Sequence, residues 1–248
     1  MNSPAKTILT PSRVPVRIKE ELAELTALSE FDSRRIPRID VQYTLPSVKM
    51  IRTDRPTEAY NIVTVSENGA SFLTGNERMD LSQVHPTAFI LGENQLQVSS
   101  KVVYCKQEQV GVQFQDPTNT LHSLIRKHFF LEFIASSLRP SVHTSYFGEE
   151  WVRNLSYGEK NSYGVEIFQQ KDGRLSLEVR LGHLNAVVRW KTGHAIRVTY
   201  TDSQQVPEDD LRRQLISFFH NLRGLRASSR HALDMVFLTE EITIQHIA

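Results

Sequence analysis

The chain from residue 39 onward alternates between apolar and polar side chains. Apolar residues occupy every second position between Ile39 and Leu45, which is the period of a half-buried β-strand. Further short stretches with strand character follow at residues 48–53, 58–65, 70–73, 88–91, 95–105 and 109–114. Turn-forming residues separate them, as at residues 66–69. Several short strands with turns between them favour a small antiparallel β-barrel.

Two stretches with helical periodicity flank these strands. Residues 17–29 precede them and place Ile18, Leu22, Leu25 and Leu28 on one helical face. Asp116-Pro117 follows them and starts a second helix, because aspartate caps free backbone amides and proline is tolerated in the first turn. The apolar stripe of this second helix consists of Leu121, Leu124, Ile125, His128, Phe129, Phe133 and Ile134. We predict that the second helix packs on the barrel and ends near residues 139–140.

The second half of the chain has a pattern of its own. Four alternating stretches between Tyr163 and Tyr200 predict a four-stranded antiparallel meander, and Asp172-Gly173 is a pair that favours a tight hairpin. A helix is expected from residue 207 to about residue 225, with acidic residues in its first turn and arginines near its end, as the helix dipole favours. Residues 141–161 are interpreted as a linker. Residues 228–248 fit either a strand or a helix.

These patterns predict a mainly β, α+β protein in three parts. Residues 1–30 form an N-terminal extension with a helix, and residues 31–138 form the β-barrel with its helix. Residues 139–248 form an α+β domain that combines the antiparallel meander with a packed helix. A chain of 248 residues is long enough for two modest domains.

Composition and charge narrow the classes of function. The formal net charge of +1 predicts no general attraction to a nucleic acid polymer or to a membrane surface. The single cysteine, Cys105, excludes an intramolecular disulfide, and its apolar strand predicts a buried packing residue. No secretory signal is visible, and the most apolar stretch, residues 128–138, is too short to span a bilayer. We expect a cytoplasmic protein without a membrane span, either a monomer or a dimer.

An arginine cluster and a turn are the features with candidate chemistry. Arg34, Arg35 and Arg38 lie within five residues just before the first strand. The guanidinium fork matches phosphate oxygens and also the O6/N7 edge of guanine. Ser66 and Gly69 belong to the turn, where a hydroxyl and an unhindered backbone can approach a ligand. Each feature alone is weak evidence, because arginine clusters are often solvated and such turns are common.

The two features in this order resemble the motifs of PilZ domains, which are bacterial receptors for cyclic di-GMP. The pattern is Arg34-x-x-x-Arg38, then Ser66-x-x-Gly69, then the strand of residues 110–114 and the helix after Asp116. The resemblance covers residues 31–138. It implies a nucleotide site that consists of Arg34, Arg35, Arg38, Thr64, Ser66, Asn68 and Gly69.

Thr64 departs from the family pattern, which has aspartate or asparagine at this position. In the family this residue accepts hydrogen bonds from the guanine base. A threonine hydroxyl carries no charge, and a charge-assisted hydrogen bond is roughly twice as strong as a neutral one. We therefore expect binding about 1–2 kcal/mol weaker than in a chain with the full pattern.

The resemblance implies a non-enzymatic receptor that changes conformation on binding cyclic di-GMP and signals to a protein partner. Control of motility, attachment or exopolysaccharide would be the output. The alternative is a nucleotide-free adaptor with the same fold that acts through protein contacts. An enzyme with a site in the C-terminal part is less favoured, because no Walker loop, dinucleotide fingerprint or Gly-x-Ser-x-Gly motif is present. No cofactor is expected. No metal is expected either, since His122 and His128 are not spaced to share one ion.

Overall fold

The computed structural model describes residues 38–41, 48–55, 59–74, 79–116, 118–147, 149–160, 162–202 and 205–246. The predicted helix at residues 17–29 lies outside these residues, and so does much of the predicted strand at 39–45. The chain divides into two compact units. The barrel unit takes the described residues of 29–139 and 206–225, and the sheet unit takes those of 140–205 and 226–248. The domain boundaries proposed from the sequence stay a prediction.

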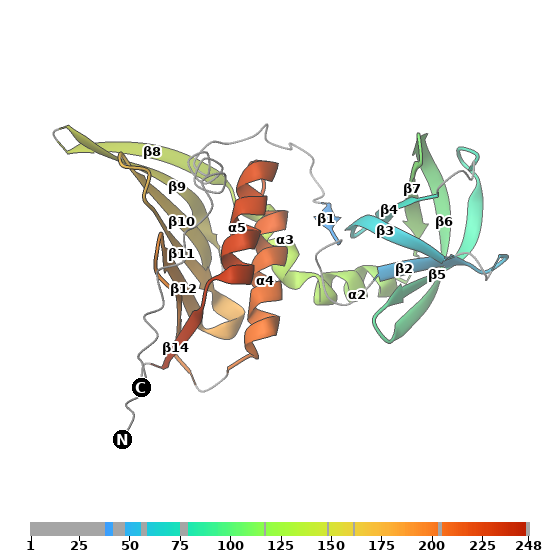
Figure 1. Cartoon of the computed structure of the whole chain (residues 1–248). Coiled ribbons are helices and arrows are strands. Elements are labelled where there is room, and N and C mark those ends of the chain that lie inside the picture. Colours follow the sequence, from blue (N-terminus) through green and yellow to red (C-terminus); the bar gives the residue numbers. More distant parts are fainter. Residues whose placement is uncertain are drawn as a thin grey trace, which may run out of the picture. The chain divides into compact units, whose positions relative to one another are not determined.

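The described residues of the barrel unit form seven strands and three helices. Its strands are β1 (Ile39–Asp40), β2 (Val48–Arg52), β3 (Ala59–Ser66), β4 (Gly69–Leu73), β5 (Val84–Leu91), β6 (Asn94–Lys106) and β7 (Gln109–Gln115). Its helices are α2 (Thr120–His128), α3 (Phe130–Ser137) and α4 (Glu208–Asn221). The strands pair in the order β3-β2-β5-β6-β7-β4, and β4 pairs again with β3 (Figure 1). This closes a six-stranded antiparallel barrel and confirms the predicted fold, while β1 pairs with β3 outside the ring.

The barrel interior is apolar and aromatic. Its strands alternate between buried and exposed positions, as the period-two pattern predicted. Tyr60 packs on Phe72 with ring centres 4.8 Å apart, and Phe89 meets Phe114 edge-on at 5.4 Å. The prediction that Cys105 is buried is wrong: it is exposed, because it lies at the end of β6 next to exposed turn residues, beyond the core.

The helix after the barrel begins at Thr120, later than the predicted start at Asp116-Pro117, and it is broken. The Asp116 carboxylate accepts hydrogen bonds from the backbone N–H groups of Leu121 at 2.7 Å and His122 at 3.3 Å, which satisfies free amides of the first turn. The predicted single helix is two helices, α2 and α3. They are separated at Phe129, whose backbone leaves the helical region at φ −105° and ψ 30° while its side chain stays fully buried.

Helix α4 joins the barrel unit through polar contacts with β1 and α3. The Asn221 side chain accepts a hydrogen bond from the Asp40 N–H at 3.0 Å and donates to the Asp40 carbonyl at 3.4 Å. One side-chain amide thus pairs with both backbone groups of a strand residue. Nearby, Ser217 donates its hydroxyl to the carboxylate of Glu132 on α3 at 2.6 Å. These contacts tie the segment that carries the arginine motif to a helix about 180 residues away in the sequence.

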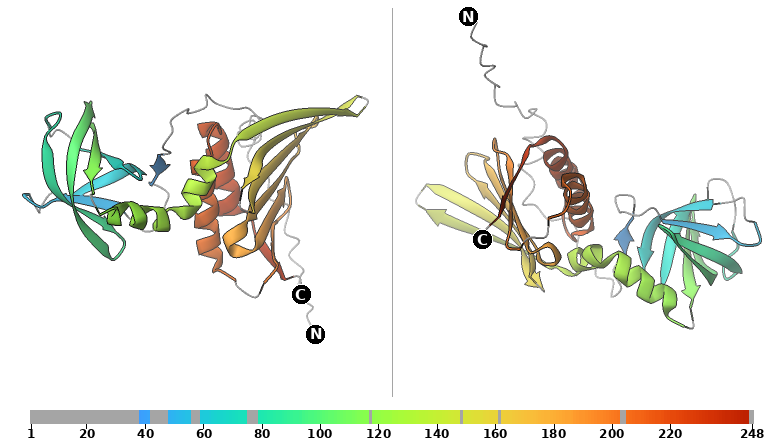
Figure 2. Two further views of the ribbon diagram at one scale, coloured as in Figure 1. Left: turned by 180° about the vertical axis from the view of Figure 1, so that it is seen from behind. Right: turned by 90° about the horizontal axis from the view of Figure 1, so that it is seen from below.

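The sheet unit is a seven-stranded sheet with order β14-β13-β12-β11-β10-β9-β8. Its elements are β8 (Pro140–Phe147), β9 (Glu150–Lys160), β10 (Tyr163–Gln170), β11 (Leu175–Leu181), a short 3-10 helix η1 (Gly182–Leu184), β12 (Ala186–Lys191), β13 (Ile196–Tyr200), α5 (Ala227–Thr239) and β14 (Ile242–His246). The predicted meander is β10 to β13, whose neighbours are antiparallel. Helix α5 lies along one face of the sheet (Figure 2).

Two interpretations of the second half are corrected or completed by the structure. Residues 141–161 are not a linker, because they form most of the paired strands β8 and β9. The tail contains both kinds of element: α5 spans Ala227–Thr239, and β14 then pairs parallel to β13. The expected helix after residue 207 is α4, Glu208–Asn221.

Glu132 makes the stability of the barrel unit depend on pH. Its side chain is 6% exposed, and burial raises its pKa above the ordinary 4.5, against the smaller lowering by the Ser217 hydrogen bond. The folded chain therefore binds the proton more tightly than the unfolded chain. The free energy of unfolding should fall by about 1.4 kcal/mol per pH unit as the pH rises from 4.5 to the raised pKa.

Glu132→Gln tests this dependence, because the glutamine can still accept from Ser217 but does not titrate. The difference in unfolding free energy, variant minus unaltered chain, should increase with pH above 4.5. Urea unfolding of both proteins at several pH values measures it. A difference that stays constant from pH 4.5 to neutrality would contradict the role of Glu132.

Candidate functional site

A hollow of about 260 Å³ in the barrel unit brings most of the predicted site residues together. Its lining includes Arg38 beside β1, Thr64 and Ser66 of β3, and Asn68 and Gly69 of the turn into β4. These are five of the seven residues that the resemblance selected. The other two, Arg34 and Arg35, lie outside the described residues.

The turn at residues 66–69 forms one wall of the hollow and is held from two sides. Ser66 donates its hydroxyl to the Gly69 carbonyl at 3.2 Å, and the Asn68 carbonyl accepts from the Phe114 N–H at 2.9 Å. The Glu67 carboxylate lies 2.8 Å from the Arg126 guanidinium and 2.9 Å from the His122 ring, both on α2. Sequence reasoning missed these contacts. They fix the turn against the helix that follows the barrel.

Gly69 is required by the close approach of two strands. A Cβ atom at this position would lie 2.3 Å from the backbone oxygen of Val112 on β7, far inside contact distance. Its φ angle is not in the left-handed region, so steric space is the reason for glycine here. The sequence analysis attributed this glycine to turn geometry and to ligand approach. The structure adds a requirement from the barrel itself.

Thr64 already uses part of its hydrogen-bonding capacity inside the protein. Its hydroxyl lies 2.7 Å from the hydroxyl of Ser71, which in turn accepts from the Gln109 amide at 3.0 Å. Ser71 is buried at 1% exposure, so this chain of hydrogen bonds is protected from water. The position that departs from the family pattern is thus tied to the barrel wall as well as lining the hollow.

Tyr104 is a site residue that sequence reasoning did not find. It lines the hollow from β6 and lies in register with Gly111 of β7. The guanidinium carbon of Arg38 is 5.7 Å from the centre of its ring, within the range of a cation–π interaction. An aromatic residue opposite a glycine in the last hairpin of the barrel was the available signal.

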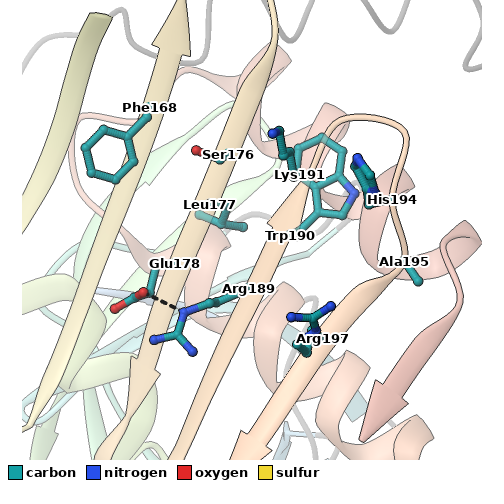
Figure 3. Close-up of a pocket in the computed structure, with 10 residues that line it drawn as sticks. All are labelled: Phe168, Ser176, Leu177, Glu178, Arg189, Trp190, Lys191, His194, Ala195 and Arg197. Atoms are coloured by element: carbon teal, nitrogen blue, oxygen red, sulfur yellow. Dashed lines mark hydrogen bonds and ion pairs between the residues drawn. The ribbon is translucent and has the colours of Figure 1, made fainter.

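A second hollow, of about 380 Å³, lies on the sheet unit over β10 to β13 (Figure 3). Glu178 and Arg189 form an ion pair there at 2.8 Å. Arg197 lies directly opposite Arg189 in the β12–β13 register, and like charges in this position repel. Among the described residues, neither Arg197 nor Lys191 has an acidic partner within ion-pair distance. This hollow has surplus positive charge and can accept an anionic group.

Two further structural findings concern the described ranges. None of their helices is sufficiently long and apolar to cross a bilayer. Within the same ranges, no three histidine, cysteine or carboxylate side chains are grouped so that they could hold a metal ion.

Comparison with known proteins finds a family match over the barrel. The family model of the PilZ domain matches residues 32–131. Two solved structures are similar to this chain. An uncharacterized Legionella protein is 13% identical with a TM-score of 0.30, covering 36% of this chain and 90% of its own. The PilZ domain of CeSA from a cellulose-synthesizing bacterium is 19% identical with a TM-score of 0.27, covering 38% and 97%. No curated protein matches the chain significantly.

Gly69→Ala tests the steric requirement at the turn. The added Cβ would meet a backbone oxygen, which cannot move without shifting β7, so the free energy of unfolding should fall by about 1–3 kcal/mol. Gly158→Ala is the matched control, because a Cβ at that exposed strand position meets nothing within 4 Å. Denaturant unfolding of both variants measures the effect. Equal stabilities would show that β4 and β7 can separate at no cost.

Proposed function

We propose that residues 32–131, which match the family model of the PilZ domain, form a receptor for cyclic di-GMP that signals to a protein partner. A PilZ domain is a binding domain and supports a role as a cyclic di-GMP effector. The observation that carries the proposal is the hollow in which Arg38, Ser66 and Gly69 meet, since these residues belong to the two motifs of the family.

The chemistry of the hollow suits part of a cyclic dinucleotide. Arg38 is exposed and offers a guanidinium fork for a phosphate or for the O6/N7 edge of guanine. Ser66 and Asn68 also line the hollow and present polar groups to it. About 260 Å³ is small for a complete ligand site, so the hollow would hold one guanine with its phosphate. Arg34 and Arg35 would act on the remainder of the ligand.

Binding would be transmitted through the contacts of β1. Arg38 is two residues from Asp40, whose backbone is clamped by Asn221 of α4. A ligand that draws the arginine segment toward the turn changes the position of β1 and hence its contact with α4. Ligand binding shifts a conformational equilibrium only through different contacts in the two states, and the Asp40–Asn221 pair offers such a contact. The predicted output, cytoplasmic location and oligomeric state stay predictions.

One observation favours a second candidate, a nucleotide-free adaptor. Thr64 replaces the aspartate or asparagine of the family pattern, and its hydroxyl is already bonded to Ser71. An adaptor would keep the fold and act through protein contacts alone. The two candidates differ in a direct titration with cyclic di-GMP.

Calorimetric titration with cyclic di-GMP tests the proposal. The unaltered chain should bind, and Arg38→Ala should weaken binding roughly 10- to 150-fold, because a hydrogen bond to a charged group is lost. Arg174→Ala, at an exposed arginine of the sheet unit, is the matched control and should bind normally. No heat from the folded, unaltered chain would favour the adaptor.

Restoring the family pattern at residue 64 gives a gain-of-function test. Thr64→Asn supplies an amide that can bond to guanine and still reach Ser71, so affinity should rise roughly 5- to 30-fold. Thr144→Asn, at an exposed position of β8, is the control. If Thr64→Asn leaves the dissociation constant unchanged, position 64 does not contact the base.

A further inference from the structure

The wall of the barrel hollow contains one aromatic side chain that belongs to neither motif. Among the described residues that line the hollow, only Tyr104 is aromatic. It is half-buried on β6, and Val102, Val103 and Tyr104 lie at an irregularity in the β6–β7 register. Its position differs from that of a core aromatic, because part of the side chain stays accessible from the hollow.

The Tyr104 ring occupies the place of a missing side chain. A Cβ atom on Gly111 would lie 1.9 Å from ring atom Cε1, 2.4 Å from Cδ1 and 2.5 Å from Cζ. The ring therefore covers the backbone of Gly111, which is itself buried, and any side chain at that position would displace it. Contact with β7 holds the ring in place before a ligand arrives. Such pre-organisation lowers the entropic cost of binding.

The ring also faces the arginine motif. The Arg38 guanidinium lies 5.7 Å from the ring centre, and both side chains line the hollow next to Ser66 and Gly69. This separation is too short to admit a base between them, so a flat, electron-rich group that stacks on the ring would displace the guanidinium from it. A nucleobase fits this description, because it stacks on aromatic rings and on guanidinium planes.

We propose that Tyr104 is a stacking platform for one base of a purine cyclic dinucleotide. The inference rests on the proposed function and adds a specific contact to it. Every nucleobase has a π-face, so the platform contributes affinity and leaves the choice of base to the polar groups of Thr64, Ser66 and Asn68. Arg38, moved away from the ring by the base, can contact the phosphate or the outer face of the stacked base.

Two substitutions separate stacking from packing. Tyr104→Phe keeps the aromatic ring over Gly111, and Tyr104→Leu keeps apolar bulk there but removes the π-face. The dissociation constant for cyclic di-GMP, measured by calorimetry, should change less than about three-fold in the Phe variant. It should rise roughly 5- to 150-fold in the Leu variant. Tyr146→Leu, at a tyrosine of β8 that is 75% exposed, is the control and should bind normally.

The outcomes distinguish this inference from the function on which it rests. If the unaltered chain binds and the Leu variant binds equally well, Tyr104 is only a packing residue and the inference is overturned. If the unaltered chain does not bind cyclic di-GMP, the proposed function and the inference both fail. If the Leu variant does not fold, the inference is tested by NMR on the unaltered chain bound to cyclic di-GMP. Stacking requires a nuclear Overhauser contact between the Tyr104 ring protons and purine H8. The absence of this contact overturns the inference.

Discussion

The closure of the barrel between β3 and β4 is the constraint on which the candidate site depends. The turn at Ser66–Gly69 joins these strands and also forms a wall of the hollow. Gly69 allows β4 to approach the Val112 backbone of β7, and Glu67 anchors the turn to α2. The contacts that complete the barrel are thus the contacts that position the polar groups of the site. The same strand and turn contacts therefore stabilise the folded barrel and hold this wall of the hollow in place before a ligand binds.

The part of the lining that contains Arg38 is built differently. Arg38 is exposed beside the two-residue strand β1, which pairs with the end of β3 and is clamped by Asn221 of α4. A ligand held in the hollow would contact a wall fixed by the barrel and a segment coupled to a later helix. This asymmetry suits a receptor more than a simple carrier, because binding energy applied to the arginine segment acts on the contact between β1 and α4.

The barrel could be predicted from the sequence because strands such as β2 and β3 have one buried face and therefore a period-two pattern. The same rule explains the error over the β8 part of residues 141–161. All the positions from Ser141 to Tyr146 are exposed, so this stretch of β8 has no buried face and no alternation to detect. The break between α2 and α3 was hidden because the apolar stripe continues through Phe129.

Only those site residues that belong to the two sequence motifs could be predicted. Ser66 and Gly69 share a turn, and their relation is visible in the sequence. The clamp of Asn221 on Asp40 joins residues 181 positions apart, and no local pattern records such a contact. Tyr104 and Gly111 are closer in sequence, but the register of β6 and β7 is shifted by an irregularity at Val102–Tyr104, which obscures their pairing.

A backbone amide NMR titration of the ¹⁵N-labelled chain with cyclic di-GMP tests the central claim most directly. The account predicts saturable shifts concentrated at Arg38, at residues 66–69 and at the β6–β7 strands around Tyr104 and Gly111. It predicts smaller shifts at Asn221, through the contact with Asp40. Shifts confined to the sheet unit, for example around Arg197, or a spectrum unchanged by the nucleotide, would contradict it.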